Sequence, residues 1–216
     1  MHFHTLDRIK HVLVSPAHFF QTVRKEKGMR EAWKFYAIIA LVGGILNLIS
    51  NALLQQYYQA FLQQMFNITL PAPEIGGILG AAFTTFAFIF GYLLSLGLVF
   101  LGAAFLHAWC IIFGGKGEYE HSFKLAVYAA TPKLALSWIP IINVFTWVWD
   151  IALLIIGTQA LHAIPRRRAI LMYVIPAALL VLFFILMAVF FITLLQKNPG
   201  IFQMALAQRA LTYGVA

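Results

Sequence analysis

The chain has 216 residues, of which 62% are hydrophobic and only 10% are charged, and its mean hydropathy is +0.86. A soluble domain is closer to half apolar and a quarter charged, so this composition excludes an ordinary soluble protein and predicts an integral membrane protein. The formal net charge of +8 gathers beside the apolar segments, which favours orientation in the membrane and attraction to lipid over nucleic-acid binding.

The amino-terminal segment, residues 1–31, is basic and amphipathic. Ser15 is a favoured helix cap and Pro16 a favoured first helical residue, so a helix is expected to begin here. Phe19 and Phe20 share one face of this helix. The basic residues that follow them are Arg24, Lys25 and Lys27. The pattern predicts an interfacial helix on an anionic cytoplasmic leaflet, the alternative being that the basic residues only orient the first span.

Charge-free runs along the rest of the chain predict five membrane spans, because about 20 apolar residues cross the hydrocarbon layer. The expected spans are 33–54, a helix within 75–115, 122–139, 143–163 and 169–195. Pro176 is expected to bend the last of them. The predicted fold class is therefore all-α, with a transmembrane domain over residues 32–196 and a tail over 197–216.

The uncharged run 75–115 is long for one crossing and short for two. Positively charged residues stay cytoplasmic. With one crossing in this run, the basic residues of segment 1–34, the connection bearing Lys116 and Lys124, and a triple arginine all lie on one side. That triple arginine consists of Arg166, Arg167 and Arg168. The sequence therefore predicts one long helix, with the amino terminus in the cytoplasm and the carboxyl terminus outside the cell membrane.

Two opposite charges, Lys133 and Asp150, lie within an apolar stretch on either side of Pro140. A turn at Pro140 would bring them to nearly the same depth, where an isolated charge costs at least about 2.5–3.5 kcal/mol. Pro132 frees a backbone carbonyl, which together with the Thr131 hydroxyl predicts a polar pocket beside the lysine. The favoured interpretation is an ion pair that fixes helix packing, and the alternative is a site for an ion, a lipid headgroup or a proton.

Other polar residues give weaker signals. Three histidines are expected at the cytoplasmic ends of spans: His107, His121 and His162. A metal site there is disfavoured, because no carboxylate or cysteine with ligand spacing accompanies them. The first span carries a polar stripe made of Asn47, Ser50 and Asn51, with Gly43 and Gly44 nearby. It predicts close helix packing, the alternative being a transport path. No nucleophile–base set is visible, so no catalytic residue, metal or cofactor is expected.

Short motifs follow one another in a fixed order through residues 15–190. They are Ser15-Pro16 with Phe19-Phe20, Gly114-Gly115-Lys116-Gly117-Glu118-Tyr119-Glu120-His121-Ser122-Phe123-Lys124, Tyr128-Ala129-Ala130-Thr131-Pro132, Ser137-Trp138-Ile139-Pro140, Trp149, Ile156-Gly157, His162 and Arg168-Ala169. Their order and spacing resemble the Yip domain family, the Ypt/Rab-GTPase-interacting membrane proteins, and its prokaryotic members in particular. The resemblance implies five spans and a cytoplasmic amino terminus.

Eukaryotic members of that family bind prenylated small GTPases and act in vesicle formation and Golgi–ER membrane shaping. This sequence shows neither their long acidic extension nor their Asp-Leu-Tyr-Gly-Pro motif, so no small GTPase partner is assigned. We expect a non-enzymatic, membrane-organising or trafficking-related scaffold that acts through its cytoplasmic face and its helix contacts. The expected partners are anionic lipid and other membrane proteins, as homo- or hetero-oligomers. The alternative is a small transporter or an ion or proton channel that uses Thr131, Lys133 and Asp150.

Overall fold

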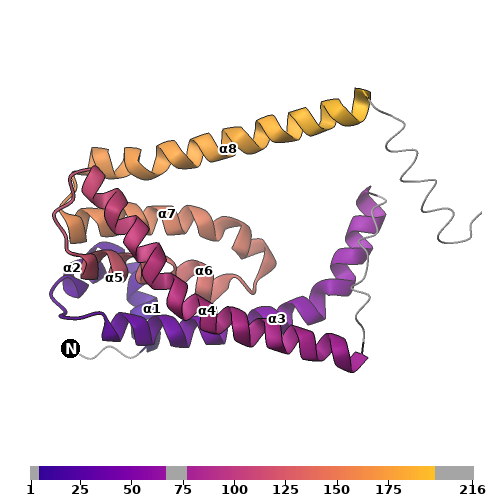
Figure 1. Cartoon of the computed structure of the whole chain (residues 1–216), viewed down its shortest axis with the longest axis horizontal. Coiled ribbons are helices and arrows are strands. Elements are labelled where there is room, and N and C mark those ends of the chain that lie inside the picture. Colours follow the sequence, from indigo (N-terminus) through magenta and orange to yellow (C-terminus); the bar gives the residue numbers. More distant parts are fainter. Residues whose placement is uncertain (1–4, 67–76, 198–216) are drawn as a thin grey trace, which may run out of the picture. The chain divides into compact units, whose positions relative to one another are not determined.

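The computed structural model describes residues 5–66 and 77–197, which form eight helices and no strand (Figure 1). The chain divides into two compact units, Met1–Ile170 and Leu171–Ala216. Seven helices lie in the first unit, and the eighth, α8 (Arg166–Lys197), begins there and continues into the second. For these residues the all-α fold class is confirmed, whereas the tail expected after residue 197 lies outside them.

Four of the described helices are long and apolar enough to cross a membrane. They are α3 (Arg30–Phe66), α4 (Gly77–Ile112), α7 (Pro140–His162) and α8. Each overlaps one of the expected spans, and α4 is one continuous helix, as the basic clusters indicated. The helix of α8 continues through Pro176. Large hydrophobic side chains stay exposed along these helices, which is typical of surfaces that face lipid.

The expected span 122–139 is not one long helix. It consists of α5 (Tyr119–Ala129), with 11 residues, and α6 (Thr131–Leu136), with 6 residues. At about 1.5 Å per residue, neither reaches across a hydrocarbon core of about 30 Å. The break precedes Pro132, which has no amide to continue the hydrogen-bond ladder of α5. By length alone, four helices in the described part of the chain can each cross a membrane by themselves.

Helix α5 is enclosed by other helices of the first unit and packs against α3, α4 and α7. Figure 1 shows it close to α2. Nearly all of its residues from 122 to 129 are buried. The Phe123 ring stacks on Phe100 of α4, with centroids 4.7 Å apart, and the Tyr128 ring meets Phe35 of α3 at 5.2 Å. A short helix, surrounded by longer ones, thus supplies much of the core.

Helix α3 meets the end of α6 through the polar stripe expected on the first span. The Asn47 amide donates a hydrogen bond to the Ser137 carbonyl at 3.4 Å, and the Ser50 hydroxyl donates one to the Trp138 carbonyl at 2.6 Å. Both carbonyls belong to the turn that directly follows α6, so these side chains bind α3 to the turn between α6 and α7. The predicted packing role of the stripe is confirmed.

Two adjacent glycines bring α3 close to both of its neighbours. A Cβ added at Gly43 would lie 1.9 Å from the Leu134 carbonyl oxygen of α6. A Cβ added at Gly44 would lie 2.8 Å from the ring of Phe88 on α4. Small residues allow helix backbones to approach closely in a membrane protein, and here a backbone atom occupies the space that a side chain at Gly43 would need.

The amino-terminal segment forms α1 (Thr5–Val14) and α2 (Pro16–Val23). Helix α2 begins as the sequence predicts, with Ser15 as its cap residue and Pro16 in the first turn. The sequence placed Phe19 and Phe20 on a membrane surface, but these rings are only 2% and 0% exposed. They face the protein core instead, because α2 packs along α7.

Candidate functional site: polar clusters and a basic surface

The residues of the expected intramembrane site lie on adjoining helices. Thr131 is fully buried at the start of α6, and Asp150 is half-buried on α7, which packs against α6. The Thr131 hydroxyl and one carboxylate oxygen of Asp150, Oδ1, are buried without a hydrogen-bond partner among the described residues. The Lys133 side chain is exposed, and its charge acts on Asp150. Residues 5–66 and 77–197 contain no salt bridge between these two side chains, and the Asp150 carboxylate interacts with the Lys133 backbone as well as with the Lys133 charge.

Asp150→Asn is expected to lower the melting temperature of the purified protein in detergent, because Lys133 then loses an opposite charge on the neighbouring helix. The loss in unfolding free energy should not exceed about 3 kcal/mol, the cost of one uncompensated charge at membrane depth. The double variant Lys133→Met/Asp150→Asn should recover part of the loss. An unchanged melting temperature in Asp150→Asn would contradict an energetic coupling of the two residues.

A second polar cluster, which the sequence did not reveal, surrounds Lys124 of α5. The sequence predicts a charge at the membrane boundary for this lysine, but Lys124 is only 1% exposed. Its ammonium group donates to the Glu120 carboxylate at 2.5 Å, to the Glu26 carbonyl at 2.5 Å and to the Val23 carbonyl at 3.4 Å. All three donors of the ammonium group therefore have acceptors. Two of these acceptors come from the end of α2 and the turn after it, so Lys124 ties that segment to the core.

The pKa of Glu120 is lowered by this arrangement. Partial burial alone would raise the pKa of Glu120, but the hydrogen bond and charge of Lys124 and a backbone hydrogen bond from Gly28 outweigh it and lower the pKa. A carboxyl with a lowered pKa in the folded state stabilises the fold above its unfolded pKa, and this contribution is lost as the pH falls through the folded value. The link between α2 and α5 should therefore weaken only in acid.

Arg8 anchors α1 to the same cluster. Its guanidinium donates a hydrogen bond to the Tyr128 hydroxyl and forms an ion pair with the Glu26 carboxylate at 3.3 Å. The Arg8 side chain is only 6% exposed, and a guanidinium so deeply buried needs such partners. The buried charges of this cluster are thus paired with one another and hold helices together, which is a structural use of charge.

The three histidines that the sequence placed at one depth do lie close together, around Ser122 of α5. The Ser122 hydroxyl is 2.9 Å from His107 Nδ1 and 3.0 Å from His162 Nε2, and the rings of His121 and His162 are 6.5 Å apart. Because a hydroxyl donates one hydrogen bond and accepts another, Ser122 can bridge the two imidazoles. Within the described ranges no group of three His, Cys, Asp or Glu residues is arranged to hold a metal ion.

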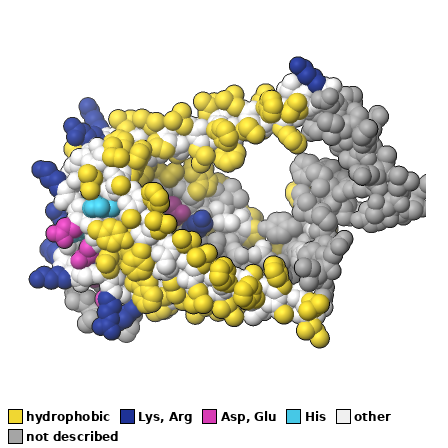
Figure 2. Space-filling view, in the orientation of Figure 1, with side chains coloured by type: hydrophobic (Ala, Val, Ile, Leu, Met, Phe, Trp, Pro, Cys, Tyr) yellow, Lys and Arg dark blue, Asp and Glu magenta, His cyan; other side chains and the backbone are white. Residues whose placement is uncertain are grey.

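A basic surface forms where the end of α2 meets the end of α7. Its residues, all of them exposed, are Arg24, Lys25, Lys27, Arg166, Arg167 and Arg168. The Arg24 guanidinium donates a hydrogen bond to the Ala160 carbonyl of α7 at 3.2 Å, which ties the two basic segments together across 136 residues of sequence. In the first unit, Figure 2 shows Lys and Arg side chains gathered at one end, beyond helices covered by hydrophobic side chains.

Comparisons with known proteins agree with this architecture. A scan against protein families matches the Yip1 domain over residues 10–189, which covers most of the chain. Neither the curated proteins nor the solved structures that were compared with the chain gave a match. The matched range runs from α1 into α8 and includes the basic surface and, except for Arg8, the residues of the polar clusters. This multi-helix membrane protein therefore belongs to the Yip1 domain family.

Proposed function

We propose that the protein is a non-enzymatic scaffold of the Yip type, which organises the membrane or its partner proteins through the basic surface and through helix contacts. The basic surface is the observation that carries the proposal, because two segments far apart in the sequence combine to form it. The buried charges around Lys124 and Arg8 are engaged in holding helices together. The exposed charges are those left available to a partner.

The position of Arg166, Arg167 and Arg168 supports this reading. They fill the first turn of α8, where the positive end of the helix dipole disfavours cations by about 0.3–1 kcal/mol each. Three arginines at this position therefore do not serve the stability of α8. Their contribution lies in attraction to an anionic membrane surface and in fixing the orientation of the chain.

For the orientation, we propose five crossings of the cell membrane, with the amino terminus and the basic surface in the cytoplasm and the carboxyl terminus outside. In this arrangement α5 and α6 together form a broken third crossing. Such a break is tolerated at membrane depth where protein covers it, and Thr131 and Pro132 are both buried.

Single cysteines introduced at Asp7 and Lys197, in a Cys110→Ser background, are expected to react with a membrane-impermeant thiol reagent from opposite sides of sealed vesicles. The two sites flank all of the helices proposed to cross, so five crossings would place them on opposite sides of the membrane. Labelling of both cysteines from one side would exclude five crossings.

The scaffold role predicts that specific membrane proteins co-purify with the chain from cross-linked native membranes, as identified by mass spectrometry. Replacing Lys25, Lys27, Arg167 and Arg168 with glutamine should abolish the co-purification of these partner proteins, because the four side chains are exposed and available to a partner. The matched control replaces Lys10 and Lys116, which are exposed outside the basic surface, with glutamine. An unchanged set of partners in the first variant would contradict the proposal. Ion or proton flux through the purified protein in liposomes would favour the transport alternative instead.

A further inference from the structure

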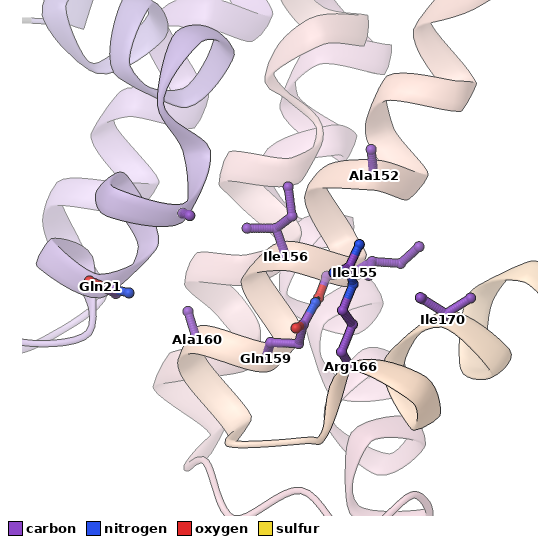
Figure 3. A pocket seen from close by; sticks show the side chains of 9 residues that line it. Gln21, Ala152, Ile155, Ile156, Gln159, Ala160, Arg166 and Ile170 are labelled. Atoms are coloured by element: carbon purple, nitrogen blue, oxygen red, sulfur yellow. The ribbon is translucent and has the colours of Figure 1, made fainter.

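An open cavity of about 550 Å³ lies among α2, α7 and the first turns of α8, entirely within the unit Met1–Ile170 (Figure 3). Most of its lining is apolar and includes Ala152, Ile155 and Ile156 of α7. Ligand sites in proteins commonly have volumes of about 300–1,000 Å³ and combine an apolar lining with a few polar groups. The cavity has these proportions, and it belongs to none of the polar clusters described above.

The polar groups of the cavity come from three helices and are neutral or positive. Gln21 and Gln159 contribute amides, and Arg166 contributes a guanidinium. Figure 3 shows the Arg166 side chain reaching from α8 alongside Gln159 and Ile155 of α7. No acidic residue lines the cavity. The ligand that complements this lining has an anionic group next to an apolar body.

Two arginines mark the edge where that anionic group would lie. The Arg166 guanidinium has no hydrogen-bond or ion-pair partner within residues 5–66 and 77–197, so its five donors are available to a ligand. The Arg24 guanidinium is held at the Ala160 carbonyl, and Ala160 itself lines the cavity. Guanidinium groups bind phosphate through paired hydrogen bonds, more specifically than an ammonium group does.

We propose that this cavity binds one anionic phospholipid, with its phosphate at Arg166 and an acyl chain along Ile155, Ile156 and Ile170. Helices α7 and α8 are both apolar enough to cross a membrane, so the surrounding bilayer supplies this ligand. Basic pockets between membrane helices recognise lipid headgroups in this way. The inference rests on the proposed function, because it requires that the basic surface faces a membrane leaflet. It adds that the partner of Arg166, one residue of that surface, is a lipid.

Native mass spectrometry of the full-length protein in detergent tests the proposal, with phosphatidylglycerol and phosphatidylcholine of identical chains as probes. The protein should retain one phosphatidylglycerol in preference to phosphatidylcholine. Arg166→Gln should weaken phosphatidylglycerol binding about tenfold or more, because it removes a charge-assisted contact to the phosphate. The matched control is Arg30→Gln, at an exposed arginine that neither lines the cavity nor belongs to the basic surface, and this variant should bind as the wild type does.

A second pair of variants tests the apolar part of the site without changing charge. Ala152→Phe fills the cavity and should reduce the binding of both lipids, whereas Ala104→Phe, at an exposed alanine of α4, should leave both unchanged. Equal loss of phosphatidylglycerol binding in Arg166→Gln and Arg30→Gln would overturn the proposal, since it would indicate diffuse attraction. So would unaltered binding in Ala152→Phe. Either result would leave the scaffold role standing, because that role is measured by partner proteins in variants that retain Arg166.

Discussion

Gly43→Ala is expected to be among the most destabilising single substitutions in this chain. The added Cβ would lie 1.9 Å from the Leu134 carbonyl oxygen, and a backbone atom has no rotamer with which to move aside. Helices α3 and α6 must then separate, which also pulls Asn47 and Ser50 away from the carbonyls at the end of α6. We expect a loss of about 3 kcal/mol, at the upper end of what overpacking costs, measured by thermal or denaturant unfolding in detergent.

Gly97→Ala is the matched control for that experiment. Gly97 lies within α4, and a Cβ added there would have no atom within 4 Å. Because alanine favours helix more than glycine does, Gly97→Ala should be neutral or slightly stabilising. If the two variants unfold alike, the close contact between α3 and α6 does not exist in the folded protein.

Lys124→Met is the second substitution with a large expected effect. Methionine nearly matches the length of lysine but cannot donate hydrogen bonds, so the carbonyls of Val23 and Glu26 lose a buried donor and Glu120 loses its ion pair. We expect the unfolding free energy to fall by about 3 kcal/mol, less than the upper figure for buried pairs because Glu120 is 28% exposed. Limited proteolysis should then cut the segment between α2 and α3 faster than in the wild type.

The exposed lysine Lys116 provides the control, since Lys116→Met changes no buried contact and should alter stability by no more than about 0.5 kcal/mol. Wild-type stability and wild-type protease resistance in Lys124→Met would mean that the buried lysine does not attach the amino-terminal helices to the core.

Features that depend on neighbouring residues were predictable from the sequence. The start of α2 follows from Ser15 and Pro16, and the continuous helix α4 follows from an uncharged run whose single crossing places the basic clusters on one side of the membrane. The packing stripe on α3 was also predictable, because small and amide residues recur on one face of the helix. In each case the local residues carry the physical cause.

Features that depend on distant partners were not predictable. A lysine beside an apolar run has the pattern of a charge at the membrane boundary. No residue near Lys124 in the sequence indicates that its ammonium group donates hydrogen bonds to carbonyls 98 and 101 residues away. The burial of Phe19 and Phe20 was not predictable either, because an amphipathic helix can place its aromatic face on lipid or against another helix, here α7. For the expected span 122–139, apolar length was a poor guide, because Pro132 divides it and other helices cover it.

The contact between Arg8 and Tyr128, 120 residues apart, has a consequence for biogenesis. Ribosomes add about 5–20 residues per second, so roughly 6–24 s pass between the synthesis of these two residues. During that interval α1 and α2 have been synthesised, but α5, the helix that carries Tyr128, has not. The aromatic face of α2 is therefore uncovered in every newly made copy, and the nearest apolar phase available to it is the lipid beside the translocation machinery.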